Sequence, residues 1–285
     1  MGVYVRAQKA GKVALMALAA LVLTAAPVAA AGWSTPVPWQ WNTSGTERMP
    51  WVYGDTVYLI YGSYDIYFST YDETLGSWSQ PQPVPGPINT AAANEINPVV
   101  VKGGKVLYFA RYSPTSDYEF YRSEWDEAKG EWGQPVKVTA WNTEAQEWDL
   151  WVNEDDTVAY LTTKGSYGDQ KGLGGQDVWK SVRVNGEWST PVNLGAPIDS
   201  QGDEWSIFVG PDGKIYIDSN RAGTVGKMDI FVAADEKSTP VDLGAPFNSP
   251  EDEREISFNN KWFFITSTRD GGKGGYDLWV CQWQE

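Results

Sequence analysis

Residues 203–232 read DEWSIFVGPDGKIYIDSNRAGTVGKMDIFV, and this stretch decides the fold. Residues 204–209 and 214–219 alternate apolar and polar side chains, a pattern that predicts two strands. The GPDG between them, at 210–213, is typical of a hairpin turn, because Asp and Gly accept the backbone angles that such turns need. A glycine-containing loop then leads to a third strand at 228–233. Three short strands cannot bury a core alone, so this unit needs neighbours.

The chain supplies those neighbours by repeating one plan five times. Each copy opens with a Glu before an apolar strand, continues with a turn, a second strand, a loop and a third strand, and ends in a Trp-x-x-Pro segment or a close variant of it. That segment reads as an outer fourth strand, where Pro is tolerated because one side of the ladder is free. Four antiparallel strands per unit, at a period near 50 residues, predict an all-β, five-bladed β-propeller. The leading acids are Glu47, Glu95, Glu147, Glu204 and Glu253.

Both ends of the chain have a recognisable role. Residues 33–39 form an orphan fourth strand, which we expect to complete the fifth blade because such closure leaves no open edge. Residues 1–31 have a basic start, an apolar run and then small residues, the layout of a secretory signal, with an uncleaved anchor as the alternative. We therefore predict one propeller domain over 32–285 that is secreted or periplasmic, with no membrane span after cleavage.

Composition narrows the classes of function. The formal net charge of −15 argues against nucleic acid as a partner and favours solubility. The chain contains no His, which excludes Ser-His-Asp and Cys-His catalysis and His-ligated metals. The single Cys, Cys281, lies in a strand pattern and is expected to be a buried, inert thiol. We expect a monomer without a cofactor or dedicated metal site, and leave open a cation at the channel mouth.

In their best copies the repeats resemble the PD40, or TolB-like, class of WD40-related propeller repeats. The DE at 203–204, PDGK at 211–214, SNR at 219–221 and DIF at 229–231 follow that pattern nearly in full. The fifth unit matches well, and the earlier units keep the frame but lose individual residues. The resemblance implies a propeller and, in function, an envelope-associated binding or scaffold module, often with protein partners. Some five-bladed propellers are glycosidases.

Propeller topology brings three groups of each blade to one face, which we call the top. They are the leading Glu, an Arg after the second strand, and the acid that opens the third strand. The ring of five Glu could bind a cation or a basic peptide, or each Glu could pair with an Arg and fasten its blade. Recurrence in every blade favours the fastening role. The expected clusters are Glu204 with Arg221 and Asp229, Glu253 with Arg269 and Asp277, and Glu95 with Arg111 and Glu119.

Two blades depart from this plan. The first has Tyr61 where the Arg is expected, and the third has Lys164 there. Glu47 and Glu147 are thereby left without that partner. A specific ligand breaks fivefold symmetry. The first and third blades lack the Arg, and the third and fifth carry an additional acid on their first strands, so we expect a binding pocket over blades one, three and five.

Other asymmetries concern the first strand of each blade. Two residues after the leading Glu, the third and fifth blades have an acid, Asp149 and Glu255, on the side of the strand that faces the axis. Trp148 and Trp205 directly follow leading Glu residues and are the best aromatic contacts for a ligand.

These observations favour a secreted or envelope-associated binding module that recognises a ligand or protein partner through its top face without turnover. One alternative is a glycoside hydrolase-like enzyme that uses top-face carboxylates, with Asp149, Glu204 and Glu253 as the catalytic candidates. A second alternative is a protein-docking scaffold. The expected partner is therefore a protein or a carbohydrate.

Overall fold

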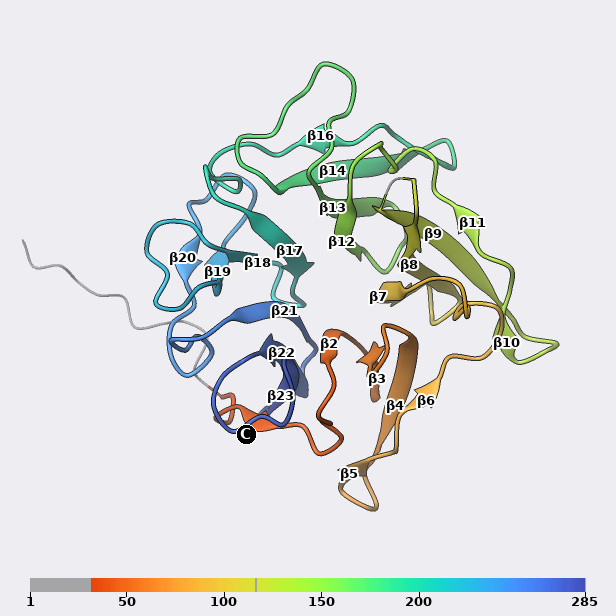
Figure 1. The fold of residues 1–285 in the computed structure, drawn as a ribbon, viewed down its shortest axis with the longest axis vertical. Coiled ribbons are helices and arrows are strands. Elements are labelled where there is room, and N and C mark those ends of the chain that lie inside the picture. The colour runs from red at the N-terminus through yellow and green to blue at the C-terminus, as the bar shows by residue number, and fades with distance from the viewer. Residues whose placement is uncertain (1–31, 116, 285) are drawn as a thin grey trace, which may run out of the picture.

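Five small antiparallel sheets stand around a common axis, and the chain visits them in order (Figure 1). This computed structural model describes residues 32–115 and 117–284, which contain 23 strands and no helix. The prediction of an all-β, five-bladed propeller is therefore confirmed. The predicted signal at 1–31 lies outside the described residues.

The blades follow the sequence repeats, and the outer strand of blades 1 to 3 is split into two short parts. Blade 1 contains β2 (Glu47–Tyr53), β3 (Thr56–Tyr61), β4 (Ile66–Asp72), β5 (Ser77–Trp78) and β6 (Gln82–Pro83). Blade 2 contains β7 (Glu95–Val101), β8 (Val106–Ser113), β9 (Asp117–Asp126), β10 (Glu131–Trp132) and β11 (Val136–Lys137). Blade 3 contains β12 (Glu147–Val152), β13 (Val158–Thr163), β14 (Asp177–Val184), β15 (Glu187–Trp188) and β16 (Val192–Asn193). Blade 4 contains β17 (Glu204–Val209), β18 (Ile215–Ser219), β19 (Asp229–Ala233) and β20 (Val241–Asp242). Blade 5 contains β21 (Glu253–Phe258), β22 (Trp262–Ser267), β23 (Asp277–Gln282) and β1 (Val37–Pro38).

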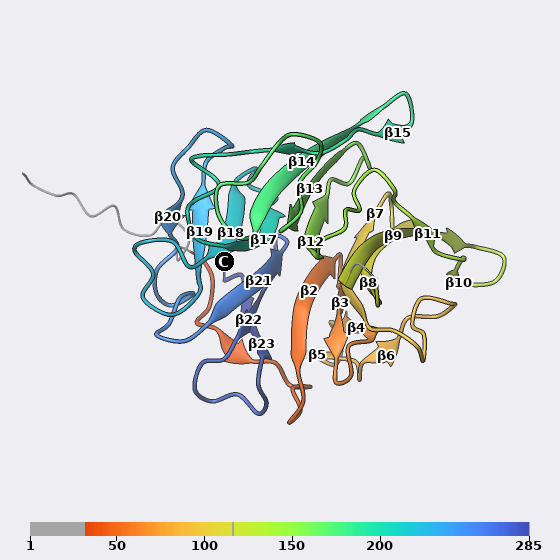
Figure 2. The ribbon, with the colours of Figure 1, turned by 45° about the horizontal axis from the view of Figure 1, so that its top comes forward.

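The ring is closed by the N-terminal strand, as predicted. Strand β1 pairs with β23, with Val37 opposite Val280 and Pro38 opposite Trp279. The last blade therefore contains strands from both ends of the described chain, and its outer edge is covered. In Figure 2, β1 is the unlabelled orange-red arrow beside β23, on the side away from β2.

Two of the recurring Trp residues of the outer strands, Trp78 and Trp188, pack between blades. The Trp78 ring of blade 1 lies 5.3 Å from Phe264 and 5.2 Å from Trp262, both in blade 5. The Trp188 ring of blade 3 lies 4.7 Å from Trp141, in the linker that follows blade 2. These contacts bury large aromatic surfaces where neighbouring sheets meet, so the Trp repeat serves the ring itself.

None of the described segments forms a helix that could cross a membrane.

Candidate functional site

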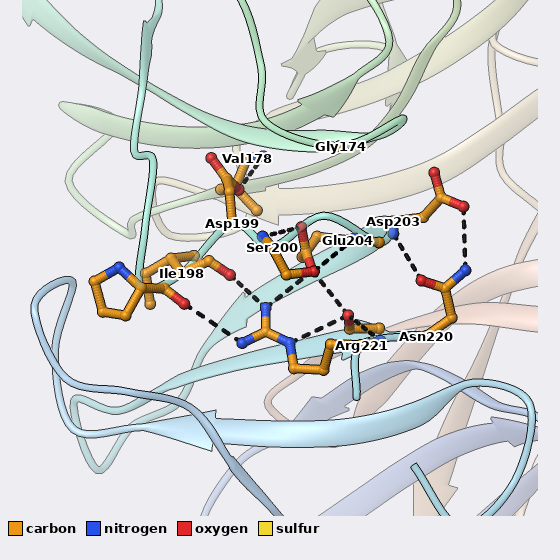
Figure 3. Close-up of polar contacts among 12 residues, drawn as sticks. Gly174, Val178, Ile198, Asp199, Ser200, Asp203, Glu204, Asn220 and Arg221 are labelled. Carbon is orange, nitrogen blue, oxygen red and sulfur yellow. Dashed lines mark hydrogen bonds and ion pairs between the residues drawn. The ribbon is translucent and has the colours of Figure 1, made fainter. Parts of the chain in front are cut away.

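Each of the five leading Glu holds the preceding linker to its blade through hydrogen bonds, an arrangement that we call the clamp. Each is the first residue of an innermost strand, and each side chain is fully buried. In blade 4, Glu204 accepts the Ser200 N–H at 3.0 Å and the Ser200 hydroxyl at 2.7 Å (Figure 3). Equivalent pairs of bonds in the other blades come from the Thr or Ser four or five residues before the Glu; these are Thr43, Thr90, Thr143 and Ser249.

Three blades add an arginine to this clamp. Arg221 donates to Glu204 at 2.9 Å and to the carbonyls of Pro197 and Ile198 in the preceding linker (Figure 3). Arg111 and Arg269 make the same three kinds of contact in blades 2 and 5. A buried carboxylate that is paired and hydrogen-bonded in this way holds a linker to its blade and has little capacity left for a ligand.

The residue before each Ser or Thr extends the clamp to the preceding blade. Asn248 accepts the Ile230 N–H at 2.9 Å and donates to the Ile230 carbonyl at 2.9 Å. Asn42, Asn89 and Asn142 do the same for the blades before them, and Asp199 accepts the Val178 N–H. Each linker therefore ties the third strand of one blade to the leading Glu of the next.

In blades 4 and 5 the acids that open the third strands, Asp229 and Asp277, bond to their own loops and not to their own Glu and Arg, contrary to our expectation. In blade 2, Glu119 stands opposite Arg111 in the strand register. Asp229 accepts the N–H groups of Val225 and Gly226, within its own loop. Burial raises the pKa of Asp229, and Glu253 of the next blade is among the charges that add to this rise. Asp277 similarly caps its own loop, and Glu119 is ion-paired with Lys137 at 2.7 Å. The linker to the next blade bonds to the third strand of each blade. The acids at the start of the third strands therefore lie at the boundary between two blades.

Lys164 does not take the place of the missing arginine in blade 3. In blades 2, 4 and 5 an arginine donates to the carbonyl of the residue before the linker Asn or Asp. In blade 3 the equivalent residue is Trp141, and the Tyr167 hydroxyl donates to its carbonyl instead. Burial raises the pKa of Glu147 to about 7. In blade 1, Tyr61 packs against the Tyr67 ring at 5.4 Å, and burial raises the pKa of Glu47. The two departing blades therefore keep the Glu buried, and Tyr61 is a packing residue.

The predicted axis-facing residues share a structural feature that the sequence did not reveal. A β-bulge follows the leading Glu in every innermost strand, at or near this position. Bulges re-aim side chains at functional sites and at sheet rims. The side chains at this position are all nearly buried: Met49, Asn97, Asp149, Ser206 and Glu255.

Three buried acids lie close together here: Asp149 on β12, Asp218 on β18 and Glu255 on β21. Asp149 accepts the Ile207 N–H at 2.9 Å, and Asp218 accepts the Glu255 N–H at 3.2 Å. Burial raises the pKa of Asp149 well above its usual range, and the charges of Glu255 and Asp218 add to the rise. Burial and Glu255 together raise the pKa of Asp218 to about 6. Glu255 is ion-paired with Arg48 of blade 1. We call these three acids the axial acids.

Aromatic rings and cations gather beside the axial acids, at positions next to the leading Glu or in top-face loops. The rings of Trp148 and Trp205 lie 5.3 Å apart in an edge-to-face contact. Arg48 lies over the Trp148 ring at 5.6 Å and over the Tyr276 ring at 4.7 Å. Trp148, Trp205 and Tyr276 are half-buried. We call the following six side chains the mouth residues: Arg48, Trp148, Lys164, Trp205, Arg254 and Tyr276.

Several polar atoms around the mouth have no hydrogen-bond partner among the described residues. They are Arg48 Nε, Trp148 Nε1, Arg254 Nε and Glu255 Oε2. An unpaired buried polar group costs roughly 1–3 kcal/mol, so four in one place need an explanation. A site that receives a polar, hydroxyl-bearing ligand is one such explanation.

A trio of acid oxygens elsewhere could in principle hold a cation. The oxygens of Asp177, Asp199 and Glu204 lie within 4.8 Å of one another. These residues form the clamp between blades 3 and 4, and they accept main-chain N–H groups from Leu173, Val178 and Ser200. Their arrangement is explained by the clamp, and we assign no metal to it.

A hollow of about 430 Å³ lies away from the mouth, at the face that carries the hairpin turns of blades 4 and 5. It is lined by aromatic rings that include Trp33, Tyr216 and Trp283, with Asp212 and Lys214 among its polar groups. None of the axial acids or mouth residues lines this hollow. We place the candidate site at the mouth because buried acids, cations and half-buried aromatic rings meet there.

Sequence reasoning found part of this site. Asp149, Trp148, Lys164, Trp205 and Glu255 were predicted, and the structure brings them to the mouth or the axis. The other predicted site residues (Glu47, Glu95, Glu147, Glu204, Glu253, Arg111, Arg221 and Arg269) lie in the clamps.

Four residues of the site were not predicted from the sequence: Arg48, Arg254, Asp218 and Tyr276. Arg48 and Arg254 have the same offset from a leading Glu as Trp148 and Trp205, so that offset could have revealed them. Asp218 and Tyr276 stand outside the repeat pattern, and only the fold brings them close.

The comparisons with known proteins support the fold. No family model matches the chain, and no curated protein sequence does. Among solved structures, an α-L-arabinofuranosidase from Podospora anserina, solved with cellotriose, has a TM-score of 0.53 at 12% identity, over 89% of this chain and 97% of that one. A gluconolactonase from Xanthomonas campestris has a TM-score of 0.50 at 14% identity, over 83% and 72%.

A GH43_12 protein from a capybara gut metagenome also has a TM-score of 0.50, at 16% identity, over 86% of this chain and 52% of that one. Identities this low show a shared propeller architecture and no more. The similar structures therefore include propellers that act on sugars.

Proposed function

We propose that the protein binds a carbohydrate at the mouth residues and hydrolyses a glycosidic bond with the axial acids. The observation that carries this proposal is the juxtaposition of Trp148, Trp205 and Tyr276 with three buried carboxyl groups. Sugar rings stack on aromatic faces, and glycoside hydrolysis needs one carboxyl group to protonate the leaving oxygen and a second to activate water or attack the sugar.

The environments of two axial acids suit these two roles. Burial raises the pKa of Asp149 well above its usual range, and a raised pKa suits a general acid. Glu255 is ion-paired with Arg48 and has one oxygen without a partner among the described residues, which suits a base or nucleophile. Glu204 and Glu253 are not carried forward as catalytic candidates, because their oxygens are engaged in the clamps.

One observation favours a second candidate, glycan binding without turnover. Asp149 and Asp218 each accept a main-chain N–H from the neighbouring blade, so these acids also hold the inner strands together. If Asp149 and Asp218 serve only to hold the inner strands together, the aromatic mouth would bind a glycan without cleaving it. Under either candidate, we propose that the protein is secreted or periplasmic and that its repeats are related to the PD40, or TolB-like, propeller repeats.

The test is to incubate the chain with soluble arabinoxylan, galactan and polygalacturonate and to measure both new reducing ends and binding. If the protein hydrolyses a glycan, new reducing ends should appear. Asp149→Asn and Glu255→Gln should each lower the rate of their appearance at least about 100-fold, because each substitution removes one of the two required carboxyl groups. Trp205→Ala, at a half-buried position, should weaken binding without unfolding the ring. Trp283→Ala, in the hollow away from the mouth, is the matched control and should change neither quantity.

Binding without reducing ends would favour the second candidate. Neither binding nor turnover of any of the three glycans, or activity unchanged in Trp205→Ala and Glu255→Gln, would overturn the proposal.

A further inference from the structure

Positive side chains are scarce in this chain, and nearly all arginines of residues 32–115 and 117–284 have an acidic partner. The sequence has 22 Lys and Arg against 37 Asp and Glu. Within the described part of the chain, every arginine except Arg254 has a carboxylate oxygen within 4.0 Å. An unpaired arginine in so acidic a protein is therefore an exception that needs a reason.

Arg254 occupies a defined place at the mouth. Its guanidinium lies over the Trp205 ring at 5.5 Å and over the Tyr276 ring at 5.8 Å. The side chain is half-buried, and its Nε is one of the four polar atoms without a partner in the described residues. A planar guanidinium held between two rings, with free donors, is the usual means of binding a carboxylate through two parallel hydrogen bonds.

Lys164 is a second cation on the same ring. Its Nζ lies 5.0 Å from the centre of the Trp205 ring, and its side chain is exposed. Lys164 has no carboxylate within 4.0 Å in the described part of the chain. Trp205 is thus a stacking face with a positive charge on Arg254 and another on Lys164.

The charges around the mouth do not cancel these two cations. Arg48 is offset by its ion pair with Glu255. Asp149 is buried and accepts the Ile207 N–H, and burial raises its pKa well above the usual range.

Two further acids lie near the mouth. Arg254 lies near enough to Asp218 to lower its pKa without contacting it as an ion pair, and Asp252 accepts a hydrogen bond from the Tyr276 hydroxyl at 3.2 Å. Arg254 and Lys164 are therefore two cations on one aromatic ring that have no carboxylate within 4.0 Å among the described residues, and such an arrangement favours an anionic ligand.

We propose that the mouth selects an acidic sugar, a ring that stacks on Trp205 while its carboxylate is bound by Arg254 and Lys164. This inference rests on the proposed carbohydrate site and names its substrate class as uronate-containing glycans. The hydroxyl groups of the sugar would be hydrogen-bond partners for the unpaired polar atoms of the mouth, and its carboxylate would neutralise the charge of Arg254 and Lys164.

The test compares trigalacturonate with neutral galactotriose by calorimetry on the full chain, at low and at high salt. We expect trigalacturonate to bind at least about tenfold more tightly, since a bidentate charge-assisted contact is worth this much or more. We expect Arg254→Gln and Lys164→Gln each to remove most of that preference. Added salt should reduce it as well, because screening weakens exposed charge pairs. Lys237→Gln, at an exposed lysine of the outer edge that also lacks a carboxylate partner in the described residues, is the matched control and should leave the preference intact.

The outcomes separate this inference from the function on which it rests. Equal affinity for both trisaccharides, lost in Trp205→Ala but unchanged in Arg254→Gln, would overturn the acidic-sugar inference and keep the carbohydrate site. Absence of binding to either trisaccharide would overturn the inference. If wild type instead binds polyglutamate and Arg254→Gln does not, the mouth recognises an acidic polypeptide, and the sugar assignment fails.

Discussion

At the scale of single residues, buried charges in this protein are of two kinds. Glu204, Glu95 and Glu253 have an arginine partner, whereas Glu147 and Glu47 have only hydroxyl and N–H donors. Removing one partner of a buried ion pair leaves an uncompensated charge, which costs more than the pair itself contributes. The two kinds should therefore respond differently to substitution and to pH.

Arg221→Ala should lower the free energy of unfolding by roughly 3–5 kcal/mol, because it leaves Glu204 and two linker carbonyls unpaired. The matched control is Lys227→Ala in the same blade. Its exposed ion pair with Glu251 at 3.3 Å should matter by less than about 1 kcal/mol. Urea unfolding measures both, and equal effects of the two substitutions would contradict the clamp.

Glu147 predicts a pH dependence of stability. Burial raises its pKa from 4.5 to about 7, so the folded state holds this proton more tightly than the unfolded state. The contribution of Glu147 to stability is therefore greatest below about pH 4.5 and is lost as the pH rises to 7. Across this range, a rise of one in pH lowers the free energy of unfolding by at most about 1.4 kcal/mol through this carboxyl.

Glu147→Gln should make the decline of unfolding free energy between pH 5 and pH 7 shallower in urea titrations. Glu144→Gln, at an exposed position of the same linker, should not. A Glu147→Gln variant with the wild-type slope would show that this carboxyl does not titrate as described.

At the scale of elements, the strand that closes the ring differs from every other outer strand. Strand β1 belongs to blade 5, yet no continuous chain links it to the strand beside it. Asn42 ties the linker after β1 to Leu278 on β23 with bonds of 2.8 Å and 3.1 Å. Opening at this junction can therefore be local.

Asn42→Ala should raise hydrogen exchange of the β1 and β23 amides selectively, with a cost of roughly 1–3 kcal/mol for the unpaired main-chain groups. Asn89→Ala breaks the equivalent tie to Ile66 between blades 1 and 2, where the chain is continuous. That variant should not increase exchange in β1. Exchange spread evenly over all blades in Asn42→Ala would mean that the ring opens as one unit.

At the scale of the whole molecule, the sequence predicted architecture better than site. The alternation in 204–219 and the recurring Glu determine five blades, because each repeat must bury its faces against the next. The closing strand followed from the same count. The bulge after each leading Glu was not predictable, since no distinctive residue type marks it in all five strands.

The site was harder for a related reason. A repeat shows which residues serve the fold, and departures such as Asp149, Glu255 and Trp205 then become visible. Asp218 and Tyr276 come from a strand and a loop of neighbouring blades, and the packing of the two blades brings both close to Arg254 and Glu255. Residues that meet through topology alone leave no pattern along the chain.

The central proposal is that the ligand binds at the mouth and that the cations of the mouth select it. The most direct measurement is a crystal structure of the chain with trigalacturonate bound. We predict a sugar ring against Trp205, with its carboxylate in hydrogen-bond contact with Arg254 and near Lys164. A sugar bound only in the hollow that Trp33 and Trp283 line, with none at the mouth, would contradict the account.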